Sequence, residues 1–259
     1  MTRLLASCCA TLLAAMSVTP CLAQSVTEPP QPLQPPPTDE APATPIALLR
    51  PFVASYQVYD HGRSLGTATM QVAALDNGRW RVDLTMKGGG LLRIAGLNAE
   101  QSTVFDVVDG RYRPLGQSTV RRVLLGKRRT AGSYDWSRRV AQWTGDVKES
   151  RRAPVPLLDG DMSGLLINLA IIRDAMPGAT LHYRFVDDGR ARPQDYLVAA
   201  QTQAIQVGEL NFDALRVDRS NAGSEQTSVW VASGVPTPLR MLQSEGDETG
   251  LDLVLVGYQ

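Results

Sequence analysis

Three residues early in the chain have the spacing of a hydrolase nucleophile. Gly62, Ser64 and Gly66 fit the pattern Gly-x-Ser-x-Gly, and His182 lies downstream as a formal general base. In hydrolases this pattern forms a sharp turn between a strand and a helix, which exposes the serine hydroxyl. Here the next residues, TATMQVAA (67–74), alternate polar and apolar side chains as a strand does. The sequence therefore favours a hairpin turn at Gly62 over a catalytic Ser64.

An acidic stretch further along has the spacing of the first half of a calcium-binding loop. It consists of Asp159, Asp161, Ser163 and Gly164. The twelfth position of such a loop should supply a bidentate Glu, and here it is Ala170. Helix capping explains the acids better, because Asp161 can accept hydrogen bonds from the free N–H groups of a first helical turn. No metal ligand or cofactor is predicted, since His61 and His182 also lack a His or Cys partner at ligand spacing.

A glycine run at 88–90 precedes a short apolar segment. The run lacks the Lys-Ser/Thr pair of a phosphate-binding loop. Two interpretations stay open, a hinge before an apolar flap or a wide irregular connection. Apolar residues in a connection must be covered by core or by ligand. The ligand flap would consist of Leu91, Leu92, Ile94 and Leu97.

Basic residues cluster between positions 121 and 152, where ten of them face three acidic ones. Such a patch can attract anionic lipid or glycan headgroups. Solvated strand faces and protected sheet edges produce the same pattern. Arg also outnumbers Lys 23 to 3 throughout, which indicates a compositional bias. An anionic-headgroup rim, if present, would consist of Arg121, Arg122, Arg128 and Arg129.

The elements that must position these residues are mostly strands. From residue 52 onward, short alternating runs are separated at intervals of about ten residues by turn signals such as Asp-Gly (109–110) and Asp-Asp-Gly (187–189). This pattern predicts a meander of hairpins with about eleven or twelve strands. The fold class is therefore mainly β, as a single large antiparallel barrel that is closed or half-open.

One segment interrupts the strands. Residues 161–175 read DMSGLLINLAIIRDA and are followed by Met-Pro-Gly, which ends a helix. This predicted helix is apolar almost all round, and such a helix is buried on most sides. Eight strands enclose only side chains or one small ligand. A barrel of eleven or twelve strands must therefore hold the inserted helix, a cavity, or both.

The first 51 residues are predicted to lie outside the barrel. Arg3 is followed by an apolar run over residues 4–18, and cleavage is expected after Ala23, as in a secretory signal peptide. All three cysteines lie inside this peptide (1–23), so the processed chain is expected to have no disulfide. Residues 24–51 contain nine prolines and form a Pro-rich disordered leader, either a plain spacer or a docking segment. Residues 52–259 form the single barrel domain, exported to the periplasm.

Composition excludes several classes of protein. Lys and Arg number 26, and so do Asp and Glu, which argues against a nucleic-acid binder. Hydrophobic residues at 43% and charged residues at 20% are not those of a disordered chain. An outer-membrane barrel needs aromatic girdles and an apolar outer face. Aromatics are only 6% here, and RWRVDLTM (79–86) carries charge on both faces, so the processed chain is expected not to span a membrane.

Three segments resemble a known family. They are PFVASYQVYDHGRSLG (51–66), VGELNFDALRVDR (207–219) and SVWVASGVPTPLR (228–240). They resemble the bacterial periplasmic domain-of-unknown-function family numbered 3108, over roughly residues 51–259. The resemblance implies an exported β-rich domain and supplies no catalytic residues. By shape, the inferred architecture also looks like the half-open barrels of periplasmic lipoprotein carriers, an analogy of fold alone.

Two functions from different classes follow. The first is a non-catalytic periplasmic binder of an apolar or amphiphilic envelope molecule, a lipid for example, with apolar burial supplying the affinity. The alternative is an envelope protein-protein interaction or scaffold protein with a filled barrel and no ligand. An enzyme is not expected, because no nucleophile, base and orienting group occur together in the sequence.

Overall fold

The computed structural model describes residues 49–89, 98–123, 126–221, 225–245 and 248–259. These residues belong to one compact unit, Pro45–Gln259. The predicted signal peptide (1–23), nearly all of the Pro-rich leader (24–51) and the predicted flap (91–97) lie outside the described residues. Within the described part of the chain, no helix is both long and apolar enough to cross a bilayer.

The fold is mainly β, with sixteen strands and one α-helix in the described residues. The strands are β1 (Phe52–Asp60), β2 (Arg63–Ala74), β3 (Trp80–Gly88), β4 (Asn98–Val108), β5 (Arg111–Val123), β6 (Gly126–Asp135), β7 (Val140–Gly145), β8 (Val155–Pro156), β9 (Asp161–Met162), β10 (Thr180–Asp187), β11 (Arg190–Val198), β12 (Gln203–Val207), β13 (Leu210–Arg219), β14 (Glu225–Ala232), β15 (Arg240–Glu245) and β16 (Glu248–Tyr258). The helix is α2 (Gly164–Asp174), and two short 3-10 turns are η1 (Asp76–Gly78) and η2 (Glu149–Arg151).

The predicted count of eleven or twelve strands is too low. Strands β8 and β9 have two residues each, which is too short to show any alternation. Strand β6 begins with four exposed residues, Gly-Lys-Arg-Arg (126–129), so its first half carries no apolar signal. Both misses have the same cause, because periodicity detects a strand only where one of its faces is buried over several residues.

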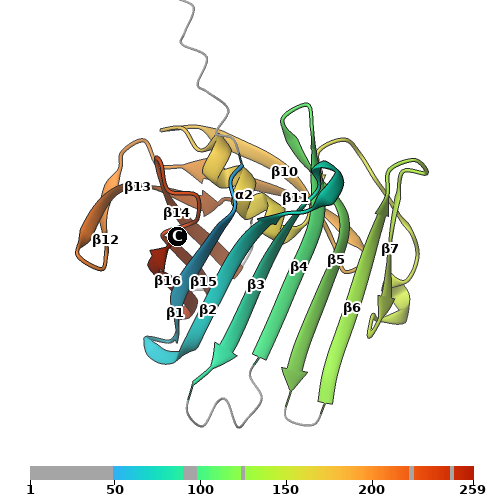
Figure 1. Cartoon of the computed structure of the whole chain (residues 1–259), viewed down its shortest axis with the longest axis horizontal. Coiled ribbons are helices and arrows are strands. Elements are labelled where there is room, and N and C mark those ends of the chain that lie inside the picture. The colour runs from blue at the N-terminus through green and yellow to red at the C-terminus, as the bar shows by residue number, and fades with distance from the viewer. Residues whose placement is uncertain (1–48, 90–97, 124–125, 222–224, 246–247) are drawn as a thin grey trace, which may run out of the picture. The chain divides into compact units, whose positions relative to one another are not determined.

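The strands form one curved sheet that follows chain order almost throughout. Its order is β8-β7-β6-β5-β4-β3-β2-β1-β16-β15-β14-β13-β11-β10-β9, and β12 pairs with β13 outside this path. In Figure 1, β1 to β7 lie side by side as the near wall, and β10, β11 and β13 to β16 lie behind them. The first and last strands of the domain, β1 and β16, are antiparallel neighbours within the sheet.

The hairpin turns lie where the sequence predicts them. His61-Gly62, Asp109-Gly110 and Asp188-Gly189 each form a two-residue connection between paired strands. Both residues of each pair have positive φ, between 48° and 75°. Type I′ turns require this conformation, and their twist matches that of the flanking strands. Gly62 is thus a turn residue, as expected, and Ser64 lies in strand β2.

Backbone hydrogen bonds do not close the sheet into a barrel. In the described residues no ladder joins β8 to β9, the two ends of the strand order. Side chains connect these two ends instead, and we call the boundary between β8 and β9 the seam. The Arg184 guanidinium of β10 lies 2.5 Å from the Asp161 carboxylate and donates to the Pro156 carbonyl oxygen of β8 at 3.3 Å. The Tyr134 hydroxyl of β6 lies 2.7 Å from the Val186 carbonyl oxygen of β10.

Helix α2 is inserted between the two walls, as the apolar segment predicts. It contacts β3, β4 and β5 on one wall and β10 and β14 on the other. Six of its eleven residues are buried. It is shorter than predicted, because it begins at Gly164 rather than at 161 and ends at Asp174. Ser163 precedes it, and its hydroxyl bonds the Thr103 hydroxyl at 2.9 Å instead of capping the helix.

The predicted capping role of Asp161 is wrong. Asp161 lies in strand β9, where its carboxylate accepts a hydrogen bond from the Leu158 backbone N–H at 2.8 Å and pairs with Arg184. It is 1% exposed. A buried carboxylate needs such partners, because leaving it unpaired in the interior is costly. Asp161 therefore fixes the seam rather than the helix.

The buried side chains form two clusters. The large cluster joins α2 to the inner faces of both walls and includes Tyr56, Met70, Leu166 and Ile171. The small cluster lies at the seam and joins β6, β7 and β8 to Val186 of β10; it includes Tyr134 and Trp143, whose rings meet edge to face at 5.6 Å. Apolar packing thus holds together the two edges that no backbone ladder joins.

Candidate ligand-binding site

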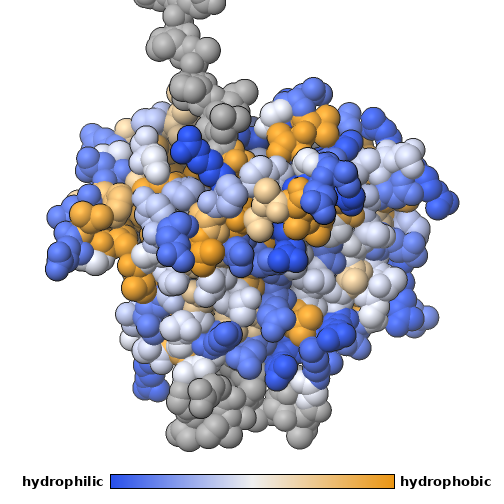
Figure 2. Space-filling model, in the orientation of Figure 1, coloured by the Kyte–Doolittle hydropathy of each residue, from blue (hydrophilic) through white to orange (hydrophobic). Residues whose placement is uncertain are grey.

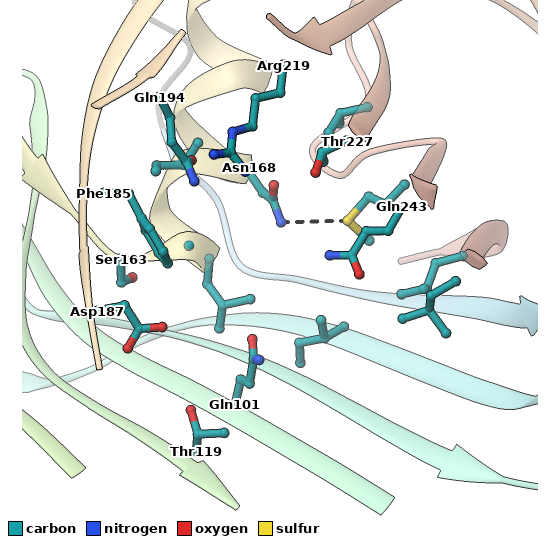
Figure 3. A pocket seen from close by; sticks show the side chains of 18 of the residues that line it. Gln101, Thr119, Ser163, Asn168, Phe185, Asp187, Gln194, Arg219, Thr227 and Gln243 are labelled. Carbon is teal, nitrogen blue, oxygen red and sulfur yellow. Dashed lines mark hydrogen bonds between the residues drawn. The ribbon is translucent and has the colours of Figure 1, made fainter. Parts of the chain in front are cut away.

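A large cavity lies between helix α2 and the inner faces of the sheet. Its volume is about 770 Å³, and it is lined by α2 and by strands of both walls, namely β3 to β5, β10, β11 and β13 to β16. Cavities of about 300–1,000 Å³ are typical of small-molecule sites. The side chains of the described residues therefore do not fill the space that the curved sheet encloses. Figure 3 shows labelled side chains from α2 and several strands around this space.

One part of the cavity wall is apolar. It is formed by residues of β3, α2, β15 and β16, namely Leu84, Met86, Leu165, Ile167, Met241 and Leu253. The Phe185 ring of β10 also lines the cavity, with the Arg192 guanidinium 5.4 Å from its centroid. An alkyl chain or the apolar face of a ring would gain free energy by covering this surface.

The rest of the wall carries amide and hydroxyl groups. Several of these bond to one another, as the Gln194 amide oxygen does with the Tyr196 hydroxyl at 2.8 Å. Four others have no hydrogen-bond partner among the described residues. They are Gln101, Thr119, Thr227 and Gln243, all labelled in Figure 3. These groups can donate to and accept from a ligand, so the cavity suits a molecule that has both polar and apolar parts.

Arg219 brings a positive charge to the cavity wall. In Figure 3 its side chain points toward Asn168 and Gln194. Its Nε atom is buried and has no hydrogen-bond partner in the described residues. Burial raises the pKa of the neighbouring Tyr196 to about 12, and the charge of Arg219 acts in the opposite direction. An unpaired guanidinium N–H inside a cavity favours an anionic or strongly accepting ligand atom.

A second, smaller cavity adjoins the first. Its volume is about 310 Å³, and it shares six lining residues with the large cavity, including Arg121, Phe185 and Asp187. Six of its lining residues are basic and three are acidic. The basic residues are Arg121, Arg128, Lys148, Arg151, Arg190 and Arg192. We call this space the basic annexe.

Asp187 lies where the two cavities meet. It accepts a hydrogen bond from the Gln117 amide, whose oxygen lies 2.6 Å from the Tyr134 hydroxyl. Burial raises the pKa of the Asp187 carboxyl, and this effect outweighs the opposing effects of the Gln117 hydrogen bond and of Arg121. The junction therefore contains an acid that is more easily protonated than a surface carboxyl.

The structure separates the four arginines of the predicted rim into two pairs. Arg121 and Arg128 are paired across strands β5 and β6 and line the basic annexe. Arg122 and Arg129 are their chain neighbours, so they point to the opposite, outer face of the same strands. Both are exposed. The four predicted flap residues lie outside the described residues.

The formal Ser-His pair of the sequence is not assembled. The Ser64 hydroxyl accepts a hydrogen bond from the Gln57 amide at 2.7 Å. His182 lies on the exposed face of β10, where its Nδ1 atom is 2.8 Å from the Asp195 carboxylate. Ser64 and His182 thus each form a hydrogen bond within their own hairpin.

Sequence reasoning missed the polar residues of the cavity. Along β4, the side chains of Ala99, Gln101, Thr103 and Phe105 all face inward, because alternate residues share a face. The alternation along β4 carried a signal for this, since Phe105 is apolar and lies on the same face of the strand as Gln101. From the sequence alone, where a sheet encloses a cavity, a polar strand residue that faces the cavity cannot be told from one that faces solvent.

Comparisons with known proteins identify a family and no activity. A family model described as a protein of unknown function (DUF3108) matches residues 54–250. Among solved structures, the chain is similar to a β-barrel-like protein of the domain of unknown function DUF1849 from Brucella abortus. That similarity has 10% identity and a TM-score of 0.48, and it covers 82% of this chain and 98% of that chain. No curated protein matches the chain.

Proposed function

We propose a function from the premise that this chain belongs to the DUF3108 family, whose description states no activity. The protein is a non-catalytic binder of an amphiphilic molecule, held in the cavity of about 770 Å³ between α2 and the sheet. One observation carries this proposal. The cavity combines an apolar wall with amide and hydroxyl groups that have no protein partner in the described residues.

The lining favours an amphiphilic ligand over a purely apolar one. Covering Gln101, Thr119, Thr227 and Gln243 with alkyl chain alone would leave four polar groups desolvated without hydrogen bonds. Each such loss costs about 1–3 kcal/mol. A ligand with hydroxyl, amide or ester groups on one side avoids this cost, and its apolar part can cover Leu84, Met86 and Leu253.

Binding without chemistry is the simplest use of these residues. The cavity lining includes neither His182 nor Ser64. Its acids in the described residues are Asp187, which bonds Gln117, and Glu225. General acid–base catalysis needs an acid and a base within reach of one reacting group, and these two carboxyl groups are not hydrogen-bonded to each other in the described residues.

The proposed location is the bacterial periplasm. This part of the proposal rests on the sequence of residues 1–23, which has the charge, apolar run and small residues of a cleavable export signal. An envelope compartment also supplies amphiphiles such as lipids and their precursors, which match the chemistry of the cavity.

A cavity-filling variant tests the proposal. In Gln101→Trp an indole occupies the space between β4 and α2, whereas in Glu100→Trp the same side chain is placed on the exposed outer face of the same strand. The full chain is expressed with its own N-terminus, purified without detergent and weighed by native mass spectrometry. We expect a bound amphiphile on the wild type and on Glu100→Trp, and its loss from Gln101→Trp.

Two results would contradict the proposal. One is an adduct retained in full by a folded Gln101→Trp variant. The other is a wild-type chain that carries no adduct either as purified or after incubation with a total membrane lipid extract. Solvent extraction and mass analysis of a retained adduct would identify its chemical class directly.

A further inference from the structure

We propose that the basic annexe is the subsite for a phosphate group of the bound amphiphile, whose remainder lies in the large cavity. This inference rests on the proposed binding function and names the ligand class, an amphiphile with a phosphate or an equivalent oxyanion. It is carried by an arrangement of charges that the protein leaves unpaired.

Among the described residues, most basic groups of the annexe form no ion pair. Arg151 pairs with Asp188. The other five basic residues, Arg121, Arg128, Lys148, Arg190 and Arg192, form no ion pair with any carboxylate of the described residues. The six basic and three acidic residues that line this cavity leave it with a net positive charge, and its like charges repel one another. An oxyanion placed among them would relieve this repulsion and accept charge-assisted hydrogen bonds.

The acids of the annexe are already used by the protein. Asp188 is held by Arg151. Asp146 accepts a hydrogen bond from the Arg129 backbone N–H at 2.7 Å, and Asp187 accepts one from Gln117. These contacts hold Asp188 to η2, Asp146 to β6 and Asp187 to β5. Among the described residues, Asp188 with Arg151 is the single ion pair between an acid and a basic residue of the annexe.

The annexe is open to solvent on one side and to the large cavity on the other. Arg121, Arg128 and Arg190 are exposed. Arg121 and Arg192 line both spaces, and the Arg192 guanidinium stacks over Phe185, which also lines both. A molecule can therefore place its anionic group among the arginines while its apolar part extends past Phe185 toward α2.

The geometry explains why arginine serves better than lysine here. A guanidinium presents several N–H donors in a fixed plane and binds phosphate oxygens two at a time. Arg121 and Arg128 are cross-strand neighbours on one face, so their donors converge on the same space. Their outward neighbours, Arg122 and Arg129, provide a matched control because they lie on the same hairpin and carry the same charge.

The test compares two amphiphiles and two double variants. Octyl phosphate and neutral octyl glucoside are titrated into the full-length chain below their micelle concentrations, by calorimetry, and inorganic phosphate is titrated alone. The variants are Arg121→Gln/Arg128→Gln and Arg122→Gln/Arg129→Gln. Circular dichroism and the melting temperature establish that both variants fold.

The expected result is that octyl phosphate binds the wild type at least roughly tenfold tighter than octyl glucoside, as one or two charge-assisted contacts provide. Arg121→Gln/Arg128→Gln should lose this preference and keep its affinity for octyl glucoside. Arg122→Gln/Arg129→Gln should keep the preference. Inorganic phosphate should bind more weakly than octyl phosphate, because it gains nothing from the large cavity.

Other outcomes overturn specific parts of the proposal. Equal affinity for the two amphiphiles removes the phosphate subsite and leaves the cavity as a binder. An equal loss in both double variants shows that general surface charge, not the annexe, attracts phosphate. Inorganic phosphate that binds as tightly as octyl phosphate assigns the annexe to a free oxyanion. Failure of both amphiphiles to bind contradicts the proposed function itself.

Discussion

Asp187 shows how the enclosed sheet changes the chemistry of a single residue. It follows the last apolar position of β10 and precedes a type I′ turn, a place where most carboxylates are solvated. Here it faces the junction of two cavities, and its neighbours are Gln117 and the Tyr134 network. Its burial raises its pKa, so at neutral pH the folded state must keep a charge where solvation is poor.

We predict that Asp187→Asn stabilises the folded protein near neutral pH. The folded pKa of Asp187 is raised above the unfolded value of 3.8, so its favourable contribution is complete below the unfolded pKa and is lost as pH rises through the folded one. Asparagine removes this loss and can still accept the Gln117 hydrogen bond. The melting temperature, measured from pH 4 to pH 8, should therefore differ most from that of wild type at the high end.

The control for this prediction is Asp213→Asn, which alters an exposed carboxyl on β13. Its melting temperature should follow that of wild type across the range. If Asp187→Asn is less stable than wild type at pH 8 and equal to it at pH 4, the assigned environment of Asp187 is wrong.

At the scale of secondary-structure elements, helix α2 separates the cavity from the most deeply buried part of the core. Leu165, Ile167 and Asn168 face the cavity, whereas Leu166 and Ile171 are fully buried in the main cluster. The Asn168 amide approaches the Met241 sulfur at 3.7 Å, which places the polar side of the helix toward β15 (Figure 3). One helix thus serves both packing and binding, through different faces.

We predict that Leu166→Ala lowers the free energy of unfolding by about 2–5 kcal/mol, because it leaves a void in a closely packed cluster. Met176→Ala removes a side chain of similar size that is 60% exposed, and it should change stability by less than about 0.5 kcal/mol. Urea denaturation measures both. Equal effects would mean that the helix is not packed between the walls.

Much of the element level could be predicted from the sequence, whereas the residues that line the cavity could not. Alternation predicted the hairpins, Asp-Gly and His-Gly the turns, and the unbroken apolar run the inserted helix. Periodicity gives no information about where a curved sheet ends, so β8 and β9 were missed. It also cannot distinguish Gln101, which faces an internal cavity, from Glu100, which faces solvent, because both read as polar residues on a strand.

At the scale of the whole molecule, the sheet encloses the cavity only while its two ends are held together at the seam. Side chains from β10, such as Arg184 and Val186, connect its edge to β8 and β6. The β10–β11 turn reinforces this contact, because Gly189 lies directly against the Arg151 backbone of η2. The surface seen in Figure 2 is largely hydrophilic, with apolar residues gathered near the β12–β13 hairpin, where Leu210 is 64% exposed.

We predict that Gly189→Ala opens the seam and lowers stability by more than Gly62→Ala. Both glycines occupy the second position of a type I′ turn, with φ of 69° and 75°, so both variants bear a backbone cost of about 1 kcal/mol. A methyl group at Gly62 meets no atom within 4 Å, whereas at Gly189 it collides with the Arg151 carbonyl oxygen. Hydrogen exchange should show faster exchange in β8 and β10 for Gly189→Ala alone. Equal loss of stability in the two variants would show that the contact between Gly189 and Arg151 does not hold the seam together.

The position of the seam within the chain has a topological consequence. The two ends of the strand order, β8 and β9, are separated by only four residues, 157–160, in the middle of the sequence. The strands nearest the two ends of the domain are hydrogen-bonded neighbours, with Val53 and Gln259 exchanging backbone bonds of 2.9 and 3.0 Å. In strand order, the domain is therefore a circular permutation of a meander that starts at β9 and finishes at β8. Its architecture is set by which strands are neighbours, not by the place in that order at which β1 falls.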